Sequence, residues 1–315
     1  MAREVKKKVS SVELGFGAFT TTNDQRLVDK DGNSNIQKVG FPFWRPYEVF
    51  QKLISMSWSK FLGLVLLTFT IANLLFAELY VWVGLKNLQG ALTHSYWQGY
   101  WEAFFFSTQT MSTVGYGRIS PVGPWASGLS AIESLIGLLV FALTTGLLYG
   151  RFSKPQLRLK YSDIALISPF LEGKGLMFKI ANGRNTDLLD VEVSLIISFN
   201  ELKNGKYSRQ FYPVNLERKY IPILSMTWTL VHPIDESSPL YGKSYEDYSS
   251  SNLEVLILIK AYDPSFSQTV HSRSSYMYHE IVFDARFKPT IGNDDKGRIL
   301  VDLSKLSSYE KISTI

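Results

Sequence analysis

Two long apolar stretches constrain the fold of this 315-residue chain more than any other feature. Phe61–Val83 has Glu78 as its only charge, and Pro124–Gly150 has Glu133 as its only charge. About 20 apolar residues in a helix are enough to cross the hydrocarbon core of a bilayer. We therefore expect a membrane pore domain at residues 60–155, with an outer helix at 60–83 and an inner helix at 124–151.

The segment between these stretches contains a second, shorter apolar run. Residues 100–111 (YWEAFFFSTQTM) are too few to span a membrane. A helix that enters a membrane and stops is tolerated only where protein or water surrounds it. We expect a re-entrant pore helix here, whose carbonyl end gives cations a favourable potential.

Directly after this run stands the pentapeptide Thr113-Val114-Gly115-Tyr116-Gly117, which has the known sequence of a potassium selectivity filter. Glycine tolerates backbone angles that a Cβ forbids, so glycines at alternate positions can turn successive carbonyls toward one axis. We expect K⁺, the permeant ion, to be coordinated by the carbonyls of Thr113 to Tyr116 and by the Thr113 hydroxyl. Because one chain supplies a quarter of each ring, three identical subunits are expected to complete a homotetramer. No cofactor is expected.

The distribution of basic residues predicts the orientation in the membrane. The first 60 residues hold ten Lys or Arg, whereas the loop between the spans holds only Lys86 and Arg118. The positive-inside rule therefore places both termini in the cytoplasm. Residues 1–40 are polar and are expected to be a flexible N-terminus. Residues 41–59 combine apolar side chains at helical spacing with Lys52, which predicts an amphipathic helix in the membrane interface; an extension of the first span is the alternative.

Residues 156–315 contain no further span and predict a β-sandwich. Short apolar or β-branched runs, such as 174–181, 191–199 and 253–262, are separated by turn-forming clusters. The fold class expected is thus an α+β multidomain membrane protein, with a two-span helical pore and a β-sandwich domain. The chain has no cysteine, and its histidines and acids show no metal-ligand spacing. We expect neither an enzyme nor a nucleic-acid-binding protein.

With these features the chain resembles the prokaryotic inward-rectifier potassium channels over residues 36–303. The resemblance is carried by the filter, the Tyr149-Gly150-Arg151-Phe152 end of the inner helix, His232-Pro-Ile-Asp235 and Arg273-Ser-Ser-Tyr276. It implies an immunoglobulin-like cytoplasmic domain that extends the ion path, in a protein of the plasma (inner) membrane of a prokaryote.

On the inner helix, Gly137, Phe141, Thr145 and Tyr149 recur at steps of four and share one face. Such a face serves either the pore or packing between helices. The resemblance implies the pore, with Gly137 as the bending point of the helix and Tyr149 as the side chain that narrows the cytoplasmic gate.

The resemblance also bears on pore charges. Phe141 stands where strongly rectifying relatives have an acid, Asp190 matches an acidic position of the cytoplasmic pore, and Lys260 replaces a Glu. We expect weak rectification, with Mg²⁺ and polyamines as candidate blockers. Gln109 and Glu133 are expected to support the filter, and Glu133 is alternatively a direct ion site.

Basic residues near the membrane predict a lipid site. Arg45, Lys52, Arg151 and Lys154 are expected to meet anionic lipids, where each basic group contributes on the order of 1 kcal/mol. Either sign of regulation is open, and these charges alternatively serve only to set topology. Two other functions also stay open: a two-span K⁺ channel gated by a different cytoplasmic ligand, and a membrane-tethered ligand-binding sensor.

Overall fold

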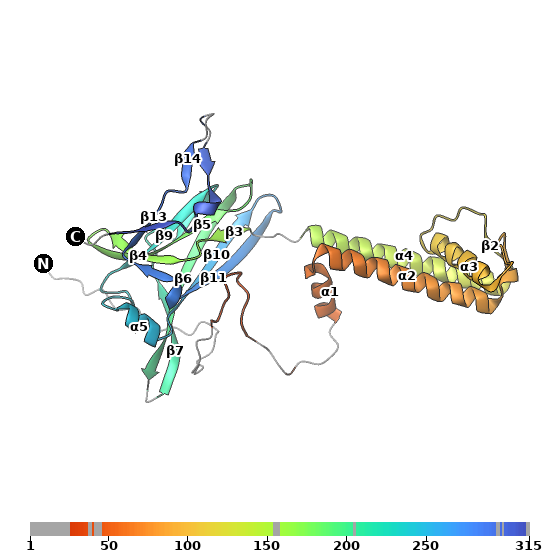
Figure 1. The fold of residues 1–315 in the computed structure, drawn as a ribbon, viewed down its shortest axis with the longest axis horizontal. Coiled ribbons are helices and arrows are strands. Elements are labelled where there is room, and N and C mark those ends of the chain that lie inside the picture. Colours follow the sequence, from red (N-terminus) through yellow and green to blue (C-terminus); the bar gives the residue numbers. More distant parts are fainter. Residues whose placement is uncertain are drawn as a thin grey trace. The chain divides into compact units, whose positions relative to one another are not determined.

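The computed structural model describes residues 26–36, 40, 46–153, 158–203, 206–293, 297 and 299–312 (Figure 1). The chain divides into two compact units. One is Gly40–Lys154, and the other combines Met1–Val39 with Pro155–Ile315.

Four helices build the first unit. They are α1 (Pro46–Ser55), α2 (Trp58–Val83), α3 (Tyr96–Met111) and α4 (Pro124–Phe152). Of these, α2 and α4 are long and apolar enough to cross a membrane, which confirms the two predicted spans. Gly84, with a φ of 107°, ends α2, and Pro124 follows Gly123 at the start of α4, where a proline loses no helical hydrogen bond.

The re-entrant helix α3 begins at Tyr96, four residues before the predicted start. Ser95 caps it by accepting a hydrogen bond from Gln98 N at 3.2 Å. Gly99 lies against the Leu85 side chain, where a Cβ would approach Leu85 Cδ1 to 2.3 Å. The polar composition of residues 95–99 had favoured a loop, but the cap and this close contact extend the helix by one turn.

Short elements connect α2 and α3 to α4. They are η1 (Leu85–Asn87), β1 (Leu88–Gln89) and β2 (Ser120–Pro121). Strands β1 and β2 pair antiparallel, Leu88 opposite Pro121, so the segments on either side of α3 are tied together.

The second unit is a sandwich of two five-stranded sheets, as the sequence predicted. One sheet has the order β11-β10-β6-β7 with β8 on β6, and the other has the order β12-β4-β5-β3 with β9 on β5. The strands of both sheets are β3 (Leu159–Tyr161), β4 (Ala165–Phe170), β5 (Gly173–Asn182), β6 (Leu188–Lys203), β7 (Lys206–Val214), β8 (Tyr220–Leu224), β9 (Thr227–Ile234), β10 (Glu254–Asp263), β11 (Gln268–Met277) and β12 (Ile281–Phe283).

The core of the sandwich lies between the sheets. Phe178 and Ile180 of β5 meet Ile197, Ile257 and Tyr276 of the facing sheet, and all five are fully buried. Strands alternate inward and outward side chains, so the runs of apolar residues noted in the sequence supply this core. Helix α5 (Tyr245–Ser250), η2 (Tyr278–Glu280), β13 (Ala285–Phe287), β14 (Ile291–Asn293), β15 (Ile299–Val301), η3 (Leu303–Lys305) and β16 (Tyr309–Lys311) complete the unit.

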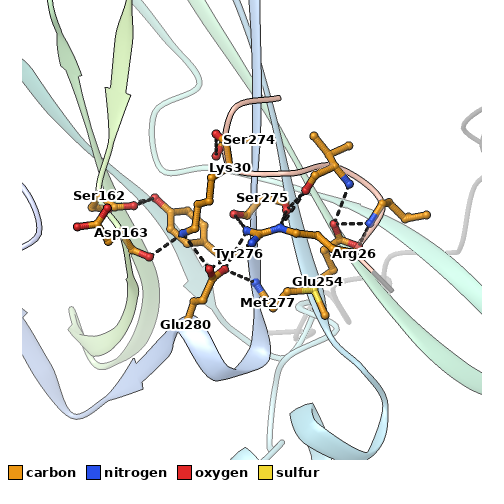
Figure 2. A network of polar contacts seen from close by, with 12 residues as sticks. Arg26, Lys30, Ser162, Asp163, Glu254, Ser274, Ser275, Tyr276, Met277 and Glu280 are labelled. Carbon is orange, nitrogen blue, oxygen red and sulfur yellow. Dashed lines mark hydrogen bonds and ion pairs between the residues drawn. The ribbon is translucent and has the colours of Figure 1, made fainter. Parts of the chain in front are cut away.

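Residues 26–36 lie on the sandwich, which corrects the expectation of a flexible tail for this part of 1–40. Leu27 and Val28 are buried and pack on Ile196, Phe211 and Leu256, on the outer side of the first sheet. Figure 2 shows the polar contacts around them.

Two carboxylates hold this docked segment. Glu254, fully buried, accepts from Leu27 N at 3.0 Å and from Arg209 Nη2 at 2.7 Å. Glu280 pairs with Arg26 at 2.9 Å and with Lys30 at 3.4 Å (Figure 2). Burial lowers the pKa of Lys30, and the neighbouring Glu280 opposes that shift.

Two serines of strand β11 bond to the docked segment. Ser275 Oγ donates to Val28 O at 2.5 Å and Ser274 Oγ to Lys30 O at 3.1 Å. Both serines are fully buried. The sequence did not predict a strand at 268–277, since the residues that satisfy these hydroxyls are more than 240 positions away in the chain.

Candidate functional site

The predicted filter follows the end of α3. Along it, residues with a positive φ angle alternate with residues that have a negative one. Thr113, Gly115 and Gly117 have φ angles of 60°, 52° and 83°, whereas Val114 and Tyr116 between them stay outside the left-handed region. This alternation turns successive peptide groups the same way, so carbonyls gather on one side and amides on the other. At Thr113 the angle is strained, because a β-branched residue rarely adopts it.

The amides of this segment are bound to the end of α3. Val114 N and Gly115 N donate to Gln109 O at 2.9 and 3.3 Å, and Thr113 N donates to Thr110 O at 3.1 Å. Gln109 therefore contacts the filter through its backbone carbonyl. With the amides used in this way, the carbonyls on the opposite side are available to a cation.

An ion pair attaches the residue after the predicted filter to α3. Arg118 donates to Glu102 of α3 at 2.6 Å and to Gly90 O at 3.3 Å. Gly90 has a φ of 86°, and a Cβ there would lie 1.9 Å from Arg118 O. We did not predict these contacts, since they join residues that carry no shared motif.

Glu133 of α4 is fully buried in a polar cluster with side chains of α2 and α3. It accepts from Tyr80 of α2 at 2.6 Å and bonds with Ser107 of α3. Ser107 also contacts Asn73 Oδ1 at 2.8 Å, so three helices meet in one hydrogen-bonded group. Sequence reasoning singled out Glu133 but missed its partners, which are neutral residues inside apolar stretches.

Gly137 differs in burial from the other three residues that were predicted to share its face of the inner helix. Phe141 and Tyr149 are 72% and 75% exposed in the single chain, and Thr145 is exposed as well. Gly137 is buried against Met111, where a Cβ would lie 2.3 Å from the carbonyl oxygen. Helix α4 continues through Gly137.

Arg151 caps α1. Its guanidinium donates to Leu53 O at 2.5 Å and Met56 O at 2.7 Å, and it lies over the rings of Trp58 and Phe61 at 4.7 and 4.5 Å. Carbonyls at a helix C-terminus lack partners within the helix, and a cation satisfies them. This use of the guanidinium competes with the predicted lipid contact.

Of the other predicted lipid-binding residues, the structure describes only Lys52. Lys52, in the last turn of α1, is exposed. Arg45 and Lys154 lie outside the described residues.

In the β-sandwich, the predicted pore charges have partners that the sequence did not reveal. Lys260 of β10 stands directly opposite Glu192 of β6 and His271 of β11. Residues opposite each other in antiparallel strands are near enough to interact, so a negative side chain stands beside Lys260 in the sheet. Asp190 accepts a hydrogen bond from Tyr220 at 2.8 Å, and this bond raises the pKa of Tyr220.

Comparison with known proteins covers both units. The model for the inward rectifier potassium channel C-terminal domain matches residues 159–315, and the model for an ion channel matches residues 69–154. The inward rectifier potassium channel Kirbac3.1 of Paramagnetospirillum magnetotacticum is 35% identical over 287 residues, which are 89% of this chain and 94% of that protein.

Among solved structures, the sporulation control protein Spo0M of Bacillus subtilis is 12% identical and covers 37% of this chain and 47% of its own. Its TM-score of 0.20 is too low to support an argument about the fold.

Proposed function

The chain belongs to the inward-rectifier potassium channel family, and from this membership we propose that four copies form a membrane pore that conducts K⁺ passively. The family consists of ion channels, so the chain is not an enzyme, as expected from its sequence. The observation that carries the proposal is the alternating backbone of residues 113–117 at the end of the re-entrant helix.

This backbone suits a dehydrated potassium ion. K⁺ leaves water only where oxygens replace its hydration shell, and rings of backbone carbonyls do so. The carbonyls of Thr113, Val114, Gly115 and Tyr116 supply one quarter of each ring, and α3 points its negative end at the ion. No resident cofactor is needed for this passive step.

The inner helix supplies the gate. Phe141, Thr145 and Tyr149 expose their side chains on one face of α4, and four Tyr149 rings in a tetramer would close the path by sterics and dewetting. Phe141 offers no charge to Mg²⁺ or polyamines. In the sandwich, Glu192 lies opposite Lys260, and Asp190 is bonded to Tyr220. Weak rectification follows from the lack of an acidic side chain at position 141.

Anionic lipids are the proposed regulators. Lys52 presents an exposed ammonium next to a membrane span, which is the geometry of an interfacial anchor. We propose that Arg151 acts indirectly, by fixing α1 and thereby Lys52. The protein is an integral membrane channel, which we place in the plasma membrane of a prokaryote with both termini in the cytoplasm, as the basic N-terminal segment requires.

Flux through the purified protein tests the function. Full-length protein in liposomes is expected to take up ⁸⁶Rb⁺ in a Ba²⁺-sensitive manner, with little ²²Na⁺ uptake. Protein-free liposomes and the filter variant Gly115→Ala, which cannot keep the left-handed angle at low cost, are the controls. Equal uptake of both ions, or no uptake above the controls, would overturn the proposal. A sensor tethered to the membrane would give the second result.

A further inference from the structure

Two of the contacts between the re-entrant helix and the inner helix lie one helical turn apart. Ser107 of α3 bonds with Glu133 of α4, and Met111 of α3 lies against Gly137 of α4. Both steps, 107 to 111 and 133 to 137, are four residues, so one stripe of each helix makes both contacts.

The first point is a polar attachment. Glu133 and Ser107 are both fully buried, and Tyr80 and Asn73 of α2 complete their hydrogen bonds. The hydrogen bonds of this group join buried polar side chains of α2, α3 and α4, and leaving such a group unpaired is costly.

The second point is a close approach of two backbones. A Cβ on Gly137 would lie 2.3 Å from Met111 O and 2.9 Å from its Cα. These are backbone atoms, which cannot turn aside as a flexible side chain can. Gly128 and Gly146 on the same helix have nothing within 4 Å of the corresponding position. At Gly150 the nearest atom is the end of a flexible side chain, Ile54 Cδ1 at 3.0 Å, so among the glycines of α4 only Gly137 lies this close to backbone atoms.

The end of α3 in turn holds the filter. Thr110, next to Met111, accepts the amide of Thr113, and Gln109 accepts those of Val114 and Gly115. A displacement of the end of α3 at Met111 is therefore transmitted to the filter through these three hydrogen bonds.

We propose that Gly137 is a positioning residue for ion selectivity: together with Glu133 it sets the distance between α4 and the end of α3, and so the geometry of the filter. This inference rests on the proposed K⁺ conduction. It differs from the role of bending point that the family resemblance implied, because the glycine is used here for a close contact in an unbroken helix.

The matched test compares Gly137→Ala with Gly146→Ala. Both substitutions remove a glycine from α4 and favour a straighter helix to the same degree. In liposomes containing the full-length channel, Gly137→Ala is expected to lower the ratio of ⁸⁶Rb⁺ to ²²Na⁺ uptake by about tenfold, the range expected for overpacking against a fixed neighbour. Gly146→Ala is expected to keep the wild-type ratio.

A change in flux rate without a change in the ratio, equal for both variants, would overturn the proposal and support a hinge. The other attachment point covers the case in which Gly137→Ala fails to assemble. Ser107→Ala creates no overlap and is expected to reduce selectivity. Thr108→Ser, at the half-buried neighbour whose hydroxyl bonds within α3, is expected to keep it; equal selectivity of these two would also refute the idea. Wild-type protein without Rb⁺ uptake would instead refute the proposed function itself.

Discussion

Replacing Glu254 by glutamine is expected to loosen the β-sandwich and the N-terminal segment together. Glu254 and Arg209 form an ion pair at 2.7 Å in which neither side chain is exposed. Glutamine keeps the shape and removes the charge, so Arg209 loses the buried carboxylate that pairs with it. Breaking a buried pair in this way costs about 3–5 kcal/mol.

That cost converts into a large shift of the melting temperature. For a domain of this size 1 kcal/mol corresponds to about 2–4 °C, so Glu254→Gln is expected to lower the melting temperature by on the order of 10 °C. Burial lowers the pKa of Arg209, and the neighbouring Glu254 carboxylate opposes that shift.

The chain contains a matched control. Lys174 and Asp284 form a pair at 3.0 Å whose side chains are 53% and 46% exposed. Exposed pairs contribute about 0–1 kcal/mol, so Asp284→Asn is expected to shift the melting temperature by about 2 °C or less. The two substitutions make the same chemical change and differ in burial.

Thermal melts of the full-length protein in detergent measure the effect, and hydrogen exchange of peptides from residues 26–36 and from β10 locates it. The double variant Arg209→Met/Glu254→Gln separates two causes, because it removes the buried cation but keeps a side-chain carbonyl for the amides of Leu27 and Val28. It is expected to regain most of the lost stability. If Glu254→Gln melts within about 2 °C of Asp284→Asn, the reasoning from burial is refuted.

Three further substitutions test other parts of the chain. Burial lowers the pKa of His232, whose ring nitrogens contact Asn215 O and Ser238 Oγ, so the unfolded chain binds more protons in mildly acidic solution. The stabilising contribution of neutral His232 is therefore expected to be fully present above about pH 6.5 and to be lost as the pH falls below it. Thermal melts at pH 8 and pH 5 test this: His232→Gln should lose this pH dependence, and His279→Gln, at an exposed histidine, should keep it. Phe141→Asp is expected to create voltage-dependent spermine block in inside-out patches at least about tenfold stronger than that of Phe141→Asn, and equal block would show that charge at this position does not control rectification. Arg151→Lys keeps the charge but not the planar fork that reaches the α1 carbonyls, so it is expected to impair Rb⁺ flux and the phosphoinositide response as Arg151→Ala does. If Arg151→Lys instead matches the wild type while Arg151→Ala loses both, the role of Arg151 is its charge and not the capping of α1.

The features that could be predicted from the sequence are those fixed by local composition. The spans at 58–83 and 124–152 follow from uninterrupted apolar runs, and the β-sandwich follows from short runs between turns. The filter at residues 113–117 was predicted from its five-residue signature, which is local in the sequence. Lys52 and Phe141 were singled out for their chemistry, and both side chains are exposed in the structure.

The features that could not be predicted depend on what lies opposite a residue. Gly137 has the same appearance in the sequence as Gly146, and only the position of Met111 distinguishes them. Arg151 has the charge of a lipid ligand, but the α1 carbonyls occupy it. Glu192 could have been found, since it follows Asp190 by two residues and strands repeat with that period, but its pairing with Lys260 needed the register of two strands.

Helix α1 contacts the end of α4 and follows the docked N-terminal segment in sequence. Its C-terminal carbonyls are bound by Arg151, which follows the proposed gate residue Tyr149 by two positions on α4. The docked segment, which Glu254 and Glu280 hold on the β-sandwich, precedes α1 in the chain. Glu254→Gln is expected to loosen that segment and leaves the residues of α1 and α4 unchanged. A change of Rb⁺ uptake in this variant that is absent from Asp284→Asn would therefore assign the docked segment a part in gating.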